Sequence, residues 1–282
     1  MKKINDSERN IYPFFIITLL WTWGFGFSPI ILGLQGTPLG TFLFYFGGGA
    51  PSVVGLFFVF FTYSKNKRKN YFHRCFNFKK MGIKCLFALL LFFSIIAIIG
   101  VFIGISFFHS PTPEMAFIKM LIKRPYILPL IIFISIISGP LNEEFGWRGF
   151  ALDILLKKRG FWSASAILGF IWAIWHLPWY FMPGQAQYDL LQRSLFDAFL
   201  FIPSTMLFSF VVSFVYIKTN RSVLAGAITH MLSNLITSQL LAPCTVEMST
   251  AIRYTNMFFC TAIIVYSIVS KNFKKELARI EF

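Results

Sequence analysis

The stretch Gly139-Pro-Leu-Asn-Glu-Glu-Phe-Gly-Trp-Arg-Gly149 places three charged side chains in sequence that is otherwise soluble in lipid. An almost purely apolar run, Ile127 to Ile137, precedes it, and an amphipathic run follows it. On insertion scales each ionisable side chain at mid-membrane costs roughly 2.5 to 3.5 kcal/mol. Glu143, Glu144 and Arg148 therefore require either mutual pairing or a function.

The composition is that of a polytopic membrane protein. Of the 282 residues, 56% are hydrophobic and 13% are charged, whereas about a quarter of a soluble domain is charged. No segment is polar enough to form a separate soluble domain, so we predict an all-α fold in which residues 1–282 form one integral membrane domain. The net charge of +15 accompanies no nucleic-acid recognition pattern, and the four cysteines have no zinc-site or disulfide spacing. We expect no nucleic-acid partner.

Eight apolar segments are long enough, or nearly so, to cross about 30 Å of hydrocarbon, which takes roughly 20 helical residues. The fourth is the shortest, and the charged stretch follows it directly. The predicted spans are Ile11 to Leu34, Leu39 to Tyr63, Ile83 to Phe108, Pro125 to Leu141, Phe161 to Phe181, Phe196 to Ile217, Val223 to Leu241 and Ile252 to Val269. Within the second span, Gly47-Gly-Gly-Ala-Pro51 predicts a bend or a close helix approach.

Lysine and arginine are distributed unequally between the two predicted sides of the membrane. With the connections assigned alternately, one side holds 21 of the 26 basic residues and the other holds 5. The positive-inside rule then places both termini in the cytoplasm, and in a bacterium the membrane would be the cell membrane. The basic Lys65 to Lys84 loop, which contains aromatic residues, is interpreted as lying on anionic lipid headgroups.

Three groups of polar residues interrupt the later spans. In the first, Glu144 and Arg148 are four residues apart and share a helix face, while Glu143 has no obvious local partner. The alternative is that this segment is the solvated start of an interfacial helix, with Asn142 as its N-cap.

The second group is Trp172-Ala-Ile-Trp-His176, in which Trp172 forms an aromatic wall one turn before the imidazole. The third is His230-Met-Leu-Ser-Asn234, whose two polar side chains also share a helix face. Each histidine alone could simply be a hydrogen-bonding link between helices. The pair in the third group could instead stabilise a developing oxyanion.

Together the groups form the pattern EExxxR, then an aromatic residue-xxxH, then HxxxN, on three separate late spans. This pattern resembles the CPBP family (CAAX protease and bacteriocin-processing, or Abi), which includes the type II CAAX prenyl endopeptidases. The resemblance covers about Pro125 to Leu241, so we expect residues 125–241 to hold the catalytic core helices. Trp172 stands where the family usually has Phe, which keeps an aromatic wall.

The resemblance implies an intramembrane endopeptidase with a buried polar site formed by spans four, five and seven. Glu143 would activate the attacking water with help from His176, and His230 and Asn234 would stabilise the oxyanion. Glu144 and Arg148 resemble the supporting pair of the family. These residue types suit the roles, because peptide hydrolysis needs a general base and donors aimed at the oxygen that becomes negative.

The participation of a metal is a separate question. Glu143, His176 and His230 would suit a catalytic zinc, and the family was long described as metalloproteases. However, the chain has no HExxH motif, and asparagine is an uncommon zinc ligand but a good oxyanion donor. We favour a mechanism without a cofactor and keep zinc as the alternative.

Two other functions are compatible with the pattern. A proton-coupled transporter could use intramembrane Glu, His and Arg as a relay, although we find no inverted repeat. A bacteriocin-immunity protein of the same fold would have no catalysis, and then the polar set would have no evident use. For the endopeptidase, the expected partners are the lipid bilayer and a membrane-associated peptide or lipidated protein.

Depth in the membrane gives one further prediction. If the fourth span ended at Leu141, Glu143 would lie at the surface, far from the deeply placed His176. We therefore predict a long tilted helix from about Pro125 to Lys157, kinked near Pro140, that brings Glu143 to a water-filled cleft shared with both imidazoles.

Overall fold

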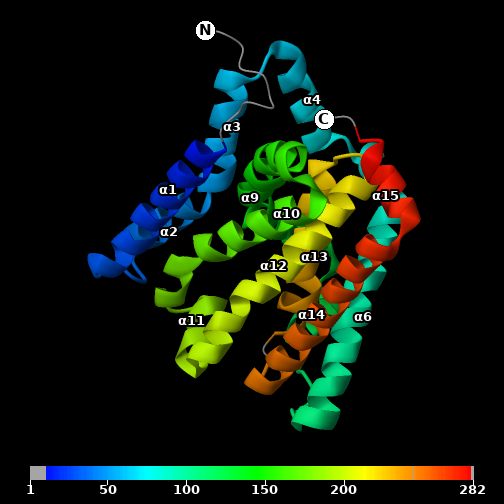
Figure 1. The fold of residues 1–282 in the computed structure, drawn as a ribbon. Helices are drawn as coiled ribbons and strands as arrows, with labels where there is room; N and C mark the ends of the chain where they lie inside the picture. Colours follow the sequence, from blue (N-terminus) through cyan, green and yellow to red (C-terminus); the bar gives the residue numbers. More distant parts are fainter. Residues whose placement is uncertain (1–10, 243, 281–282) are drawn as a thin grey trace.

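The computed structural model describes residues 11–242 and 244–280, and over these residues the chain is helical with no strand (Figure 1). The all-α prediction is thus confirmed. The helices are α1 (Tyr12–Ile31), α2 (Pro38–Gly48), α3 (Ala50–Thr62), α4 (Lys65–Phe76), α5 (Phe78–Met81), α6 (Ile83–Phe108), α7 (Ala116–Lys123), η2 (Pro125–Ile127), α8 (Leu128–Ile137), α9 (Pro140–Gly146), the π-helical turn η3 (Trp147–Ala151), α10 (Leu152–Trp175), η4 (Leu177–Phe181), α11 (Ala186–Arg193), α12 (Leu195–Lys218), α13 (Val223–Thr237), η5 (Gln239–Leu241), α14 (Val246–Val269) and α15 (Lys271–Ala278).

The predicted count of eight membrane spans is not confirmed. Within the described residues, five helical segments are long and apolar enough to cross a membrane, or six if the bent pair α2 and α3 forms one span. The difference has two sources: Pro125–Phe181, which covers the predicted fourth and fifth spans, counts as one segment, and α13 has only 15 residues. A helix rises 1.5 Å per residue, so α13 does not cover the hydrocarbon alone.

The bend predicted in the second span is present. Helices α2 and α3 meet at Gly49 and differ in direction by 49°. The glycines also permit a close approach, because Gly47 lies against α1 and its carbonyl accepts a hydrogen bond from Thr22 Oγ1 at 2.9 Å. This arrangement places α3 beside α9.

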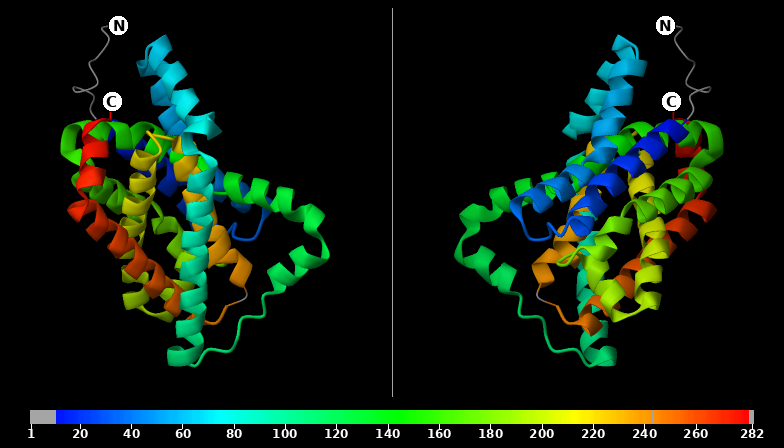
Figure 2. Two further views of the ribbon diagram at one scale, coloured as in Figure 1. Left: turned by 90° about the vertical axis from the view of Figure 1, so that its right-hand side faces the viewer. Right: turned by 90° about the vertical axis from the view of Figure 1, so that its left-hand side faces the viewer.

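The long helix expected from Pro125 to Lys157 is broken. Helix α8 ends at Ile137, and Gly139 has φ −155° and ψ −64°, outside the helical region. Helix α9 then begins at Pro140. Proline suits the first turn of a helix, because an N–H at that position would have no intrahelical acceptor. In Figure 2, α8 reaches out of the helical body, and residues 138 and 139 interrupt the helix between α8 and α9.

Glycine decides how closely α9 packs. A methyl group at Gly146 would overlap the backbone carbonyl of Pro51 in α3, and one at Gly55 would lie 2.7 Å from Gly146 Cα. The two helices therefore cross backbone against backbone, as small residues allow in membrane proteins.

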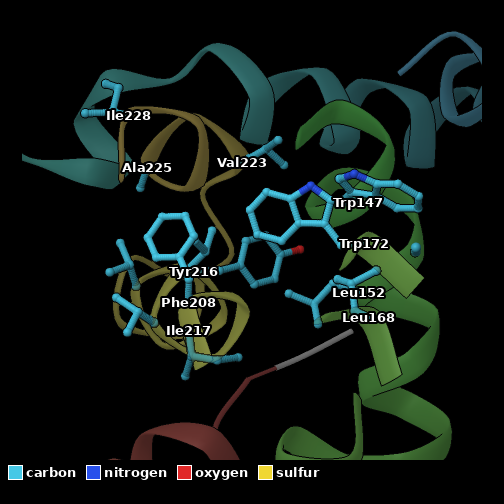
Figure 3. Close-up of a cluster of buried hydrophobic side chains, with 14 of the residues drawn as sticks. Trp147, Leu152, Leu168, Trp172, Phe208, Tyr216, Ile217, Val223, Ala225 and Ile228 are labelled. Carbon is cyan, nitrogen blue, oxygen red and sulfur yellow. The ribbon is translucent and has the colours of Figure 1, made fainter. Parts of the chain in front are cut away.

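Helix α13 lies at the centre of the fold and contacts α4, α6, α8, α9 and α12. Figure 3 shows its residues Val223, Ala225 and Ile228 in one buried cluster with Tyr216 and Ile217 of α12 and with aromatic and leucine side chains from η3 and α10. Large side chains are completely enclosed in this region, among them Trp147, Trp175 and Tyr216. This core surrounds the polar residues described next.

One end of the molecule carries α4 and α15, and the other carries α11 and the start of α14 (Figure 1). At the first end, the buried Asp153 carboxylate forms ion pairs with Arg74 at 3.0 Å and with Arg221 at 2.5 Å. Tyr216 Oη donates to the same carboxylate at 2.5 Å. Burial lowers the pKa of Arg74, but the charge of Asp153 more than offsets this, so the net shift is upward. The cluster ties α4 to α10 and α12.

Candidate active site

Glu143 lies in the first turn of α9 and is 6% exposed. Its Oε2 accepts a hydrogen bond of 2.5 Å from Trp172 Nε1 in α10. The other oxygen, Oε1, faces Gly139, where even a Cβ atom would approach to 3.3 Å. One oxygen is thus held by the indole, and the absence of a side chain at residue 139 leaves room beside the other.

Glu144 forms the predicted ion pair with Arg148, with 3.1 Å between Oε1 and Nη1, and both side chains are 0% exposed. The same Oε1 lies 3.1 Å from Nδ1 of His230 in α13. Arg148 Nη2 also donates to Ser209 Oγ in α12 at 3.2 Å. The pair therefore joins α9 and η3 to α12 and α13.

Trp172 is the residue that connects the three sequence groups. Besides donating to Glu143, its ring lies 4.5 Å from the guanidinium carbon of Arg148, a cation–π distance. Its ring centroid is 5.1 Å from that of His230 and 6.1 Å from that of His176. The predicted aromatic wall is thus also a hydrogen-bond donor.

His176 ends α10 and is half-buried among aromatic rings. Its Nδ1 lies 2.8 Å from the backbone carbonyl of Trp172. Because a carbonyl oxygen only accepts, Nδ1 carries the proton of this bond, and Nε2 of the neutral ring is an acceptor. The rings of Trp175 and Phe201 lie 4.6 Å and 5.1 Å away between centroids and fix the imidazole plane.

Asn234 differs from the other predicted site residues. It lies one helical turn after His230 on α13, as predicted, but its side chain is exposed while its neighbours Ser233 and Leu235 are buried. The structure thus brings Glu143, Glu144, Arg148 and His230 together around Trp172, whose ring also neighbours that of His176, and leaves Asn234 exposed.

The zinc alternative depends on how the possible metal ligands are arranged. Across residues 11–242 and 244–280, no group of three or more His, Cys, Asp or Glu side chains is arranged to hold a metal ion. The alternative zinc set of Glu143, His176 and His230 is therefore not gathered as three ligands, and no step below involves a metal.

Two contributions to the site could not be predicted from the sequence: the contact of Ser209 with Arg148 and the donor role of Trp172. Ser209 is one of several serines in an apolar span, and nothing in its spacing indicates contact with Arg148. The donor role of Trp172 was hidden because an aromatic wall needs no N–H. Asp153 did have a signal, since it is an isolated acid between apolar residues of the predicted helix.

The fold and this group of residues define a class: an all-helical membrane protein in which two carboxylates, an arginine and two histidines interrupt the apolar interior. Comparison with known proteins narrows that class. The family model "type II CAAX prenyl endopeptidase Rce1-like" matches residues 125–236. The predicted resemblance to type II CAAX prenyl endopeptidases is thereby confirmed.

A curated relative extends the likeness beyond the motifs. CAAX prenyl protease 2 of Methanococcus maripaludis is 24% identical over 267 residues, which are 93% of this chain and 96% of that protein. The sequence motifs had indicated a resemblance only from about Pro125 to Leu241. The matched length shows that the sequence similarity also extends over helices before Pro125.

Proposed function

We propose that this chain is an intramembrane endopeptidase in which Glu143 is the general base. The observation that carries the proposal is the hydrogen bond from Trp172 Nε1 to Glu143 Oε2 inside an apolar helical core. It orients a buried carboxylate and leaves Oε1 on the side where Gly139 makes room. The likeness to an Rce1-like family and to a CAAX prenyl protease supports the choice of reaction.

In the proposed reaction, Glu143 takes a proton from water as the oxygen attacks the scissile carbonyl carbon. His176 helps to orient this water through Nε2, because its Nδ1 proton is engaged by the Trp172 carbonyl. When the tetrahedral intermediate collapses, the C–N bond breaks and Glu143 returns the proton to the leaving amine. Glu143 is then ionised again, so the cycle needs no other reactant than water.

The negative oxygen of the intermediate would be stabilised by His230 and Asn234. With Nδ1–H of His230 donated to Glu144, the ring can donate from Nε2 only when doubly protonated. The Asn234 amide donates without that requirement, and its exposed side chain is free to meet a substrate.

The proposed substrate is a membrane-associated peptide or lipidated protein. The relative's name specifies a CAAX prenyl protease, so a prenylated peptide with a CAAX end is the first substrate to test. The same peptide without its prenyl group shows whether the lipid is recognised.

The test uses the full-length protein in liposomes and measures release of the carboxyl-terminal tripeptide by mass spectrometry. We expect Glu143→Gln to lower the rate by more than about a hundredfold, the scale of a lost general base. Glu247→Gln is the control, since it removes an exposed carboxylate at the start of α14. Substantial cleavage by purified Glu143→Gln would reject this base, and no cleavage by the wild type would reject the function.

A further inference from the structure

Three side chains from the neighbouring helices α3 and α4 hold backbone carbonyls of the segment that carries Glu143. Ser52 Oγ donates to Leu141 O at 2.7 Å, and Tyr71 Oη donates to Phe145 O at 2.8 Å. Arg74 Nη2 donates to Gly149 O at 3.3 Å. None of the three sequence motifs includes these donors.

The three carbonyls are spaced by four residues, so they form one stripe along α9 and η3, which we call the carbonyl stripe (Leu141, Phe145 and Gly149). Glu143 follows Leu141 by two residues, which places it about 200° around the helix. The donors therefore grip the segment on the side opposite to Glu143. Hydrogen bonds to a stripe fix the rotation of a helix about its own axis.

Rotation matters here because the two carboxylates reach different partners. Glu143 accepts from Trp172 of α10, and Glu144 pairs with His230 of α13. A shift by one position would turn each side chain by about 100° and break both contacts.

Packing leaves little freedom for such a rotation. Tyr71 is fully buried, and its ring lies 2.9 Å from where a Cβ of Gly149 would be. The π-helical turn begins at Trp147, and an i to i+5 turn departs from ordinary helical bonding, often at functional sites. Tyr71 and Arg74 donate to one carbonyl just before this turn and to one inside it.

The donor helix is itself anchored. Arg74 is paired with the buried Asp153 at 3.0 Å and donates to Tyr216 Oη at 2.5 Å. Asp153 also holds Arg221, so α4 is fixed to α10 and to the turn before α13. Helix α4 lies outside the candidate membrane spans, and it reaches the catalytic segment through its one buried face, formed by Tyr71, Arg74 and Cys75.

We propose that Ser52, Tyr71 and Arg74 are positioning residues that set the rotation of α9 and η3, and so direct Glu143 toward Trp172 and Glu144 toward His230. They touch neither substrate nor the reacting atoms and act through the carbonyl stripe. The expected effect on catalysis rests on the proposed function, whereas the expected effect on the rotation of α9 and η3 does not.

The test removes hydroxyl donors with little change of shape, in Tyr71→Phe and in the double variant Ser52→Ala/Tyr71→Phe. With the full-length protein in liposomes, we expect kcat to fall about tenfold in the single variant and up to about a hundredfold in the double variant, the scale of a misplaced catalytic group. KM should stay within about twofold, because ground-state binding is retained.

Tyr180→Phe is the matched control. It removes the same atom from the same kind of bond, Tyr180 Oη to Ala198 O at 2.8 Å, but the acceptor belongs to α12. We expect kcat of this variant within about twofold of the wild type. An equal loss of kcat in Tyr71→Phe and Tyr180→Phe would overturn the proposal, since the loss would then not depend on a bond to the carbonyl stripe.

Amide hydrogen exchange tests the effect on α9 and η3 separately from the effect on kcat. We expect faster exchange across residues 143–149 in Tyr71→Phe, with unchanged exchange in α14. Unchanged exchange at 143–149 together with unchanged kcat would overturn the proposal, and so would faster exchange with unchanged kcat. If the wild type cleaves no peptide, the proposed function fails, while the exchange result still decides whether Tyr71 fixes α9 and η3.

Discussion

Trp172 and Glu143, 29 residues apart in the chain, meet through a hydrogen bond of 2.5 Å between the indole Nε1 and the carboxylate Oε2. The same indole ring lies over the Arg148 guanidinium and beside the His230 ring. An aromatic residue without an N–H could fill this space, but it could not orient the carboxylate. The motif pattern requires only an aromatic wall at residue 172, and the tryptophan adds a hydrogen bond to Glu143.

Trp172→Phe should lower kcat by about tenfold or more while KM changes little. The substitution keeps the ring but removes a donor to a charged group, a bond of about 1.5 to 3 kcal/mol. Trp21→Phe is the control, because it also removes an indole N–H, here donated to Phe46 O at 3.1 Å between α1 and α2. Steady-state kinetics of both variants decide the matter, and equal activity of Trp172→Phe and wild type would contradict the orienting role.

Arg148→Ala should destabilise the protein by about 3 to 5 kcal/mol. The substitution leaves the Glu144 carboxylate, which is 0% exposed, without its guanidinium partner. Lys218→Ala is the matched control, since it breaks an ion pair of 2.7 Å with Glu276 in which both side chains are partly exposed. That pair should contribute no more than about 1 kcal/mol. Thermal unfolding in detergent measures the difference, and similar melting temperatures for the two variants would refute the prediction.

Removal of metal ions should leave proteolysis intact. The residues that the structure describes offer no cluster of three metal-binding side chains. The measurement is peptide cleavage after exhaustive dialysis against a strong chelator, with metal content determined in parallel. Loss of activity that zinc alone restores would establish the zinc alternative with Glu143, His176 and His230.

The topology prediction places the Lys65 to Lys84 loop in the cytoplasm and the Gln185 to Gln192 loop outside. In a background without the natural cysteines, Gln192→Cys should react with an impermeant thiol reagent in intact cells. Asn66→Cys should react only after permeabilisation, because 21 of the 26 basic residues lie on its predicted side. Both positions are exposed, so accessibility does not favour either one. Labelling of Asn66→Cys from outside would invert the predicted orientation.

Features that depend on neighbours along the chain could be predicted from the amino-acid sequence. Apolar segments of sufficient length predicted helices, and the glycines before Pro51 predicted the bend. The spacing of Glu144 and Arg148 predicted their ion pair, because residues four apart share a helix face. The motif pattern indicated the family that the comparisons then matched.

The partner of each polar side chain depends instead on how the helices pack in three dimensions. Spacing within one helix does not specify the rotation of that helix against the next, and a rotation of about 100° exchanges one residue for its neighbour. Here the rotation is set by contacts remote in sequence, such as Gly146 against Pro51 and Tyr71 on the Phe145 carbonyl. The break before Pro140 was also decided in this way, because a kinked continuous helix and two separate helices have the same apolar pattern.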